Sequence, residues 1–441
     1  METTPSRILI TGGIVIDPAN DVEGARDLLV EDGRIRSVTE PGGLDRHAQG
    51  ARRIDARDLL VLPGLVDMHV HLREPGFEYR ETIATGTLAA VAGGFTSVAC
   101  MANTNPVNDN AAVTEYILER AREVARANVF PVGAVSQGLE GRCLAEIGEM
   151  RRAGIVAISD DGRPVADGSL MRRALEYASM FDLPVLAHEE DPSLAQGGVA
   201  HEGEWSVRLG LRGIPSAAEE SMVARDLALL PLTGGRLHVA HVSTRGTVEL
   251  VRRAKEKGLP VTAEVTPHHL LLTEEALREY DTNAKMRPPL RSAEDREALV
   301  LALEDGTIDA IATDHAPHHP DEKDVEFEQA LDGVIGLETA LPLVFSLAAE
   351  RNIPLRTVVR AMTVAPARIL GIDRGTLSVG AVADITLFDP EVRWTYSARD
   401  GCSKSRNSPF DGWELRGRVR MTLVGGRIVW PLGPTGTIAG S

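Results

Sequence analysis

Histidine and aspartate residues recur where apolar segments end along the middle of the chain. The segment GLVDMHVHL (64–72) contains His69 and His71, which are two residues apart and therefore face the same side of an extended strand. Later apolar segments end in a further set of such residues: Asp160, Asp161, His188, His241 and Asp314. Imidazole and carboxylate groups suit zinc or another divalent first-row metal. The pattern predicts a metal site, provided that the fold brings these segment ends together.

Eight β-rich segments would have to position these residues, and helix-like stretches alternate with them. They are LVDMHVHL (65–72), FTSVACMAN (95–103), ANVFPVGAV (127–135), GIVAISDDG (154–162), LPVLAHEED (183–191), RLHVAHVST (236–244), LPVTAEVTP (259–267) and IDAIATDHAP (308–317). Continuous apolar strands are typical of a parallel sheet that is covered on both faces. The pattern predicts an α/β fold with a (β/α)8 TIM barrel, whose chemistry lies at the carboxyl ends of the strands.

The two ends of the chain carry a different pattern, in which apolar residues alternate and glycines mark turns. ITGGIVI (10–16) and LVGGRIVW (423–430) are similar to each other, although they lie at opposite ends of the chain. Such alternation indicates half-buried antiparallel strands. We predict that the ends meet in a small composite β-sandwich domain made of residues 1–61 and 371–441, with the catalytic barrel over residues 62–370.

Composition and charge narrow the classes of partner. Of the 441 residues 43% are hydrophobic, which is enough for a large core, and Lys and Arg total 47 against 64 Asp and Glu. A net charge of -17 argues against nucleic acid or an anionic membrane as the main partner. Three widely spaced cysteines, a start without a secretory pattern and no apolar run of about 18 residues favour a cytoplasmic protein without a membrane span.

A carboxylate shared by two metal ions would complete a binuclear site. Other enzymes of this architecture often use a carboxylated lysine at the end of the fourth strand, but the first lysine in this chain is Lys255. An aspartate must therefore supply any bridge. Asp161 lies nearer the end of the segment and is the predicted bridge, and Asp160 is the competing choice.

Eight motifs together resemble the dihydroorotase family of the amidohydrolase superfamily, in its bacterial class I type with an aspartate in place of the carboxylated lysine. They are HVHLREPG (69–76), ANTNP (102–106), SDDG (159–162), AHEED (187–191), AHVST (240–244), TPHHLLLT (266–273), NAKMRPPLR (283–291) and ATDHAPH (312–318). The resemblance runs over nearly the whole chain. The first and last motifs are specific in combination, whereas either alone would indicate only the superfamily.

The resemblance implies reversible cyclisation of N-carbamoyl-L-aspartate to L-dihydroorotate in pyrimidine (UMP) biosynthesis. It implies one or two zinc ions with a metal-bound hydroxide, and Asp314 as the general acid/base. The implied metal ligands are His69, His71, Asp161, His188, His241 and Asp314. The implied binders of the substrate's α-carboxylate are Arg73, Asn103 and His318, and Asn283 would lie near the ring. Arg73 also suits this role by its chemistry, because its planar fork matches a carboxylate.

Two alternative functions remain open. A hydantoinase- or dihydropyrimidinase-like cyclic amidase is disfavoured, because its substrates lack the α-carboxylate that Arg73 and Asn103 would bind. An inactive scaffold for aspartate transcarbamoylase is disfavoured, because such homologues lose metal-site histidines and this chain keeps them. Similar proteins form dimers and complexes with aspartate transcarbamoylase, so we expect a homodimer and consider that complex a candidate assembly.

Two further segments near the predicted site bear on substrate binding. ALDGVIGLET (330–339) carries Asp332 before Gly333, where the family more usually has an aromatic residue. We expect this loop to lie over the substrate, so Asp332 bears on substrate affinity. The glycine-rich connection over 190–205 is long enough to act as a lid.

Overall fold

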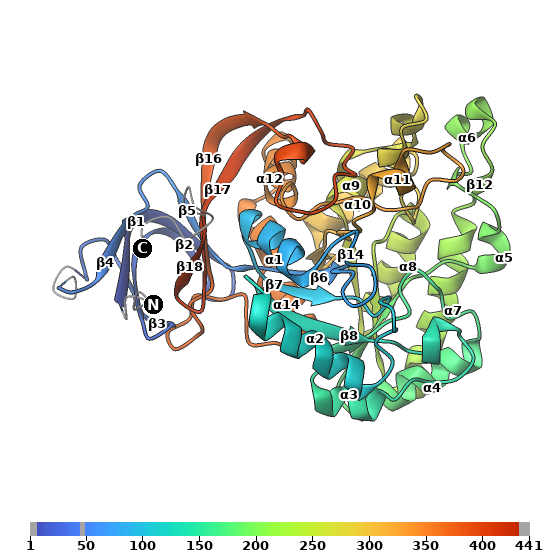
Figure 1. The fold of residues 1–441 in the computed structure, drawn as a ribbon, viewed down its shortest axis with the longest axis horizontal. Coiled ribbons are helices and arrows are strands. Elements are labelled where there is room, and N and C mark those ends of the chain that lie inside the picture. The colour runs from blue at the N-terminus through green and yellow to red at the C-terminus, as the bar shows by residue number, and fades with distance from the viewer. Residues whose placement is uncertain (1–6, 45–48, 432–441) are drawn as a thin grey trace.

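The computed structural model describes residues 7–44 and 49–431, and it has a barrel and a separate sheet (Figure 1). Eight parallel strands form the barrel in the order in which they follow one another along the chain. They are β6 (Leu65–Val70), β7 (Phe95–Cys100), β8 (Asn128–Gly133), β9 (Ala157–Ile158), β10 (Pro184–Ala187), β13 (Arg236–Val239), β14 (Val261–Val265) and β15 (Ala310–Ile311). A parallel bridge between Val70 and His315 links the first strand region to the last. The predicted (β/α)8 barrel is confirmed.

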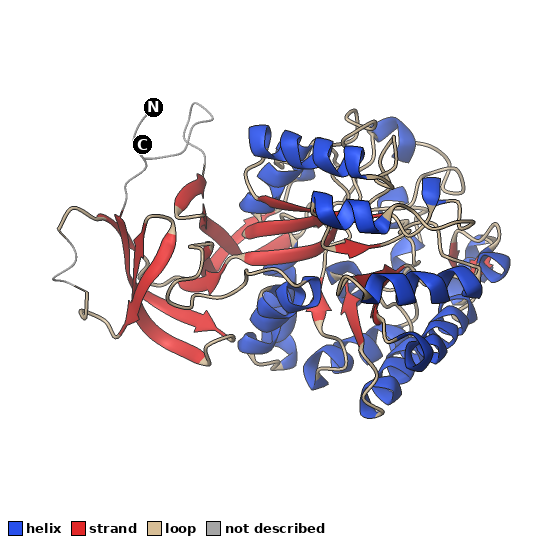
Figure 2. Ribbon diagram, turned by 90° about the horizontal axis from the view of Figure 1, so that it is seen from below, coloured by secondary structure: helices blue, strands red, loops and turns tan. Residues whose placement is uncertain are grey.

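Helices form the outer layer of the barrel (Figure 2). They are α1 (Ile83–Ala92), α2 (Ala111–Val124), α3 (Ile147–Ala153), α4 (Gly168–Ser179), α7 (Ala217–Thr233), α8 (Arg245–Glu256), α10 (Ala293–Asp305), α12 (Ala340–Arg351), α13 (Leu355–Met362) and α14 (Val364–Leu370). Helix α8 illustrates how the sequence sets them. Thr244 caps its start by accepting a hydrogen bond from the Thr247 amide, and Val248 and Val251 are buried on one face. That face packs toward β14.

Short elements follow three of the strands at the barrel mouth. Between β10 and β13 lie α5 (Pro192–Ala195), β11 (Ala200–His201), α6 (Glu204–Leu209) and β12 (Gly213–Ile214). After β14 and β15 lie α9 (Pro267–Leu271), the 3-10 helices η3 (Glu274–Leu277) and η4 (Thr282–Ala284), and α11 (Pro320–Lys323). The 190–205 connection is therefore structured. Arg291 contacts it, because its Nη1 lies 3.2 Å from His201 Nδ1 and donates to O of Ile214, the strand partner of His201, at 2.9 Å.

The separate sheet joins strands from both ends of the chain. It contains β1 (Arg7–Asp17), β2 (Val22–Glu31), β3 (Arg34–Thr39), β4 (Arg52–Asp55), β5 (Leu60–Pro63), β16 (Ile385–Thr395), β17 (Glu414–Val424) and β18 (Arg427–Trp430). The two halves meet where β5 pairs antiparallel with β16, with Pro63 opposite Ile385. The ends of the chain thus come together as predicted. Residues 1–6, 45–48 and 432–441 of the predicted end segments lie outside the described residues.

The connection between β16 and β17 leaves this sheet and reaches the barrel. It covers residues 396–413 and contains the 3-10 helix η5 (Ala398–Asp400). In Figure 1 it is the red ribbon that runs from β16 and β17 across the barrel side of the molecule. Helix η2 (Gln137–Leu139) lies in the loop after β8. Among the described residues no helix is both long and apolar enough to span a membrane.

Candidate active site

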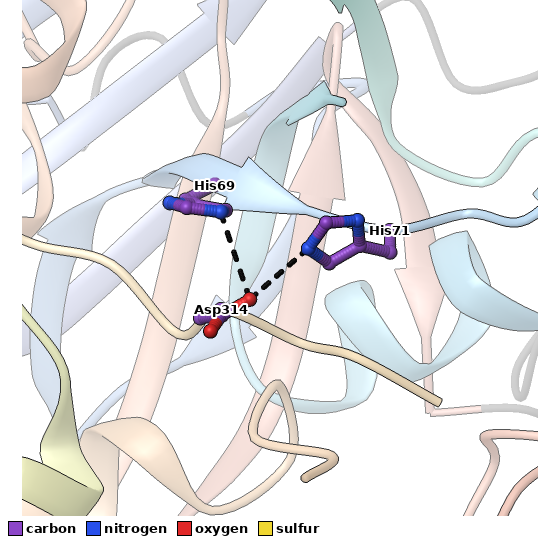
Figure 3. Close-up of side chains that lie close together, drawn as sticks. All are labelled: His69, His71 and Asp314. Carbon is purple, nitrogen blue, oxygen red and sulfur yellow. Dashed lines mark hydrogen bonds and ion pairs between the residues drawn. The ribbon is translucent and has the colours of Figure 1, made fainter. Parts of the chain in front are cut away.

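The predicted metal ligands lie together at the carboxyl ends of five barrel strands. His69 lies in β6 and His71 just after it, and the other four residues follow β9, β10, β13 and β15 within three residues. Figure 3 shows His69 and His71 pointing toward Asp314. Asp314 Oδ1 lies 3.1 Å from His71 Nε2 and 3.6 Å from His69 Nε2. Residues that are distant in the sequence thus form one buried cluster.

Asp161 lies among four histidines. Its Oδ1 is 3.3 Å from His69 Nε2 and 3.4 Å from His241 Nε2, and it is 3.6 Å from His188 Nδ1. Its Oδ2 instead faces His71 Nε2 at 3.4 Å. The two oxygens of one carboxylate therefore face two different sets of imidazole rings, which is the arrangement that a bridging ligand needs.

Asp160 has a different environment, although it is the neighbouring residue. Its Oδ1 accepts hydrogen bonds from the Val135 amide at 2.8 Å and the Ser136 amide at 3.0 Å, and its Oδ2 accepts from the Ser136 hydroxyl. Burial raises the pKa of Asp160 to about 6 despite these donors. Asp160 thus holds the loop after β8, whereas Asp161 faces the histidines.

The cluster fits a metal ion by the chemistry of its unpaired atoms. His188 Nδ1 and His241 Nε2, which face Asp161, lie 2.9 Å apart. Within the described part of the chain, the buried His69 Nε2 and Asp161 Oδ1 lack a hydrogen-bond partner. Burying such groups unpaired is costly, and a cation would satisfy them. Two sets have ligand atoms that all lie within 4.8 Å of one another: His69, His71 and Asp314, and His69, Asp161 and His241. The site can therefore hold one or two ions.

Electrostatics keep the carboxylates of the cluster ionised. Burial raises the pKa of Asp161, but the charge of His69 and the nearby ring nitrogens of His188 and His241 outweigh it and hold that pKa well below its usual range. Burial likewise opposes ionisation of Asp314, while His69 and His71 lower its pKa. An ionised carboxylate is the form that binds a cation, so the charge state suits metal binding.

Two further side chains orient the histidines. Glu264, in β14, places Oε1 2.7 Å from His69 Nδ1, and the same oxygen accepts from the His241 amide at 3.3 Å. Asn103 Oδ1 lies 2.9 Å from His71 Nδ1. A hydrogen bond to the second ring nitrogen fixes the tautomer and direction of a metal-binding histidine. The sequence analysis missed Glu264, although a lone acidic residue within the apolar strand VTAEVTP was a signal for it.

The backbone around the cluster is strained. At the cluster and just after its first strand, three residues other than glycine have a positive φ: 61° at Arg73, 32° at His241 and 45° at Asp314. Such conformations cost about 1–3 kcal/mol each and persist only where the surrounding structure imposes them. All three residues belong to the predicted site, so the strain marks a place where side-chain direction overrides backbone preference.

A cavity of about 450 Å³ adjoins the cluster and is rich in cationic groups. Arg73 lines it and is buried, with Nε donating to Pro317 O at 3.2 Å. Burial and the nearby charge of Arg80 lower the pKa of Arg73 to about 10, which leaves it cationic at neutral pH. Its Nη2 lies 3.5 Å from His318 Nε2. A buried cation beside a metal site is suited to an anionic group of a substrate.

His318 and Asn103 also line this cavity, as predicted substrate contacts should. Burial and the charge of Arg73 lower the pKa of His318 to about 3, so its ring is neutral. His318 Nε2 faces Asp332 O at 2.8 Å. Asn283 does not line this cavity but an adjoining one of about 260 Å³, in which His318 is the shared wall. The predicted contact of Asn283 with the substrate ring stays a prediction.

Asp332 and Arg287 also line this cavity. Asp332 lines the cavity, in agreement with the expected position of the 330–339 loop. Its Oδ2 lies 3.6 Å from Arg287 Nη1, and Arg287 Nε also donates to Glu190 at 2.8 Å. Arg287 thus joins the loop that carries Asp332 to the segment after β10.

Known proteins resemble this chain over most of its length. A family model described as "Dihydro-orotase-like" matches residues 58–247, and one described as "Amidohydrolase family" matches residues 336–430. The dihydroorotase of Syntrophotalea carbinolica is 55% identical over 97% of this chain and 99% of its own length. The dihydroorotase of Anaeromyxobacter dehalogenans is 56% identical over 96% of this chain and 97% of its own.

Solved structures with the same fold come from cyclic amidases. The L-hydantoinase (dihydropyrimidinase) of Arthrobacter aurescens superposes with a TM-score of 0.87 at 26% identity, covering 96% of this chain and 95% of that one. A dihydropyrimidinase of Brevibacillus agri gives a TM-score of 0.82 at 24% identity, covering 98% and 96%. The fold is shared with these enzymes, but sequence identity is much higher with the dihydroorotases. This chain therefore belongs to the dihydroorotase family.

Proposed function

We propose that this chain catalyses the reversible cyclisation of N-carbamoyl-L-aspartate to L-dihydroorotate in pyrimidine biosynthesis. The observation that carries the proposal is the buried Arg73, beside neutral His318, in the cavity that adjoins the histidine and aspartate cluster. Sequence identity of 55% and 56% with dihydroorotases, over nearly the whole length of the chain, supports it. A substrate with an α-carboxylate next to a ring amide would span both halves of this site.

We further propose zinc as the metal, with the bacterial class I arrangement in which an aspartate replaces a carboxylated lysine. The residues that would hold one or two ions are His69, His71, Asp161, His188, His241 and Asp314, with Asp161 as the bridge. Zinc, when bound, supplies a water of lowered pKa and polarises a carbonyl oxygen. Imidazole and carboxylate donors agree with this choice of ion.

Asp314 is the proposed general acid/base. It is ionised at neutral pH, so in the hydrolytic direction it can accept a proton from the attacking water. It then returns that proton to the ring amide nitrogen as the carbon–nitrogen bond breaks. In the cyclisation direction the same carboxylate takes a proton from the ureido nitrogen and gives it to the departing oxygen.

Arg73, Asn103 and His318 are the proposed binders of the α-carboxylate. Arg73 Nε is used by Pro317 O, so its terminal nitrogens remain for the substrate. Asn103 directs Oδ1 at His71, which leaves its Nδ2 to donate. A fork of this kind binds a carboxylate with defined geometry, and this geometry would hold the reacting amide over the cluster.

Wider properties of the protein belong to the same proposal. We propose a cytoplasmic homodimer, a barrel over residues 62–370, and a β-domain made of residues 1–61 and 371–441. An assembly with aspartate transcarbamoylase is proposed by analogy with similar proteins. Light scattering of the purified chain, alone and with that partner, tests both assemblies, and a monomer in both samples would contradict them.

The activity is tested by assaying purified protein of measured zinc content. We expect it to interconvert carbamoyl aspartate and dihydroorotate, and His71→Ala to abolish this conversion. His319→Ala is the matched control. The His319 side chain is 41% exposed, so its removal should leave turnover unchanged. Turnover of hydantoin or dihydrouracil without turnover of dihydroorotate would contradict the proposal and favour the hydantoinase-like alternative, for which the shared fold is the supporting observation.

A further inference from the structure

Residues 402–408, here called the strap, connect two strands of the separate sheet but run along the edge of the substrate cavity. Burial alternates along the strap. Ser403, Ser405 and Asn407 are buried, whereas Lys404 and Arg406 are exposed. This period of two is the pattern of an extended segment with one face against the protein. The strap is therefore docked on the barrel rather than looped out into solvent.

The first part of the strap is anchored on buried carboxylates of the barrel. The Cys402 amide donates to Glu338 Oε1 at 2.8 Å, and the Lys404 amide donates to Glu81 Oε1 at 3.1 Å. The Ser403 hydroxyl also donates to Glu81. Ser405 Oγ donates to Arg80 O at 2.7 Å. Hydrogen bonds to charged acceptors are the stronger kind, so they hold this part firmly.

Asn407 lies at the end of the strap, between two loops that line the substrate cavity. Its Oδ1 accepts from the His318 amide at 3.1 Å. Its Nδ2 donates to Ala316 O at 3.0 Å and to Gly333 O at 2.9 Å. Its own carbonyl accepts from the Ile335 amide at 2.9 Å. All the polar groups of the side chain are thus used by the loop after β15 and by the loop that carries Asp332.

We propose that Asn407 is a positioning residue for the substrate-carboxylate site. It sets the separation of the two loops and so directs the ring of His318 into the cavity that Arg73 shares. The role requires a donor and an acceptor on one short side chain. An aspartate would turn one oxygen toward two carbonyl oxygens, and an alanine would leave buried polar groups unpaired. The inference rests on the proposed function, because it takes His318 to bind the substrate.

The two loops are also joined without Asn407, so its loss should not dismantle them. The Ala316 amide donates to Val334 O at 2.8 Å, and the Gly333 amide donates to Lys285 O at 3.0 Å. Lys323 Nζ donates to Leu331 O at 2.7 Å. A variant at Asn407 should therefore fold and bind metal. Its defect should be a displacement of His318 rather than loss of the site.

The test compares Asn407→Ala with Asn128→Ala in the zinc-loaded enzyme. Asn128 begins β8 at the opposite end of the barrel, and its Nδ2 donates to Thr96 O at 2.9 Å and to Asp384 at 3.0 Å. We expect Asn407→Ala to raise KM for dihydroorotate at least about tenfold and to change kcat less than about threefold, with zinc content unchanged. Asn128→Ala should lower the melting temperature and leave KM within about twofold. Equal KM values in the two variants would overturn the proposal.

A double-mutant cycle with His318→Ala tests whether Asn407 acts through His318. We expect the KM of the double variant to rise by clearly less than the product of the two single increases. Independent, multiplicative effects would overturn the proposed path of action. If the wild type proved to convert a cyclic amide without a carboxylate, the proposed function would fail, and the same cycle on that substrate would still decide the role of Asn407.

Discussion

The two halves of the candidate site are built by different means. The metal cluster uses residues within a barrel strand or up to three residues after one, so parallel strand geometry brings them together. The substrate cavity instead uses loops, and the strap that holds them comes from the other sheet. Strand ends tolerate little displacement, whereas loops joined by side-chain hydrogen bonds can shift without loss of the fold. Metal binding and substrate affinity should therefore respond to different substitutions.

The largest effect should follow from removing Asp161, the proposed bridge in the half built from strand ends. Asp161→Ala takes away a carboxylate that faces four histidines, so we expect zinc loss and a fall in turnover of at least about a thousandfold. Metal analysis and steady-state assays measure both. A variant that keeps full zinc content and ordinary kcat would contradict this expectation, because Asp161 would then not be needed to hold the metal.

A smaller effect should come from Asp314→Asn, which keeps the size of the side chain and removes its basicity. We expect kcat to fall about a hundred- to ten-thousandfold, while KM changes little and zinc is retained in part. A raised KM with ordinary kcat would instead assign Asp314 to the substrate half of the site.

Glu264→Gln probes how the strand-built half is supported. The substitution replaces the carboxylate that lies 2.7 Å from His69 Nδ1 by an amide. We expect zinc affinity to weaken about 10- to 100-fold and excess zinc to restore most of the activity. Titration with a competing chelator measures the affinity. Unchanged affinity would mean that strand geometry alone holds the histidines.

Arg73→Lys probes the loop-built half. A lysine keeps the charge but loses the fork, so we expect KM to rise about tenfold or more with zinc content unchanged. Arg152→Lys is the control, because Arg152 is exposed on α3 and pairs only with Glu149 among the described residues. A loss of zinc in Arg73→Lys would show that the two halves are not separable.

The smallest effect concerns His201, which joins the segment after β10 to Arg291. His201 Nδ1 lies 3.2 Å from Arg291 Nη1, and burial together with that charge lowers the pKa of His201 to about 4. The unfolded chain binds this proton near pH 6.5, so stability falls as the pH drops from 6.5 toward 4.

Replacing His201 by glutamine keeps a hydrogen-bond acceptor and removes the titration. We expect the wild type to lose about 1–2 kcal/mol more than His201→Gln over this pH range, with both proteins equal above pH 7. Thermal unfolding at pH 7.5 and pH 5 measures the difference. Parallel acid losses in the two proteins would mean that the segment is not held through Arg291.

The strand-built half could be predicted from the sequence because it depends on local patterns. Alternation assigned His69 and His71 to one face, and the ends of apolar segments gave the other predicted ligands. The choice between Asp160 and Asp161 could not be settled in this way. It depends on the amides of Val135 and Ser136, which belong to a different loop and capture Asp160.

In the half built from loops, which forms the substrate cavity, residues were predicted only where they belong to a motif of the resembled family. Nothing near Asn407 in the sequence indicates His318, because 89 residues separate them and the contact depends on tertiary structure. Alternation does not extend to His241, since β13 ends at Val239 and the backbone at His241 has a φ of 32°. Local periodicity ends where a strand ends, and side-chain direction beyond that point is set by packing.

The pairing of β5 with β16 has a consequence for synthesis of the chain. More than 300 residues separate these strands, so β1 to β5 leave the ribosome with one edge open while the barrel is still being made. At ordinary translation rates this interval lasts roughly 15–60 s. The strap follows β16, so Asn407 reaches the pocket only after all the barrel strands have been made. A nascent chain could thus complete every barrel strand and its metal ligands before it gained a finished substrate pocket.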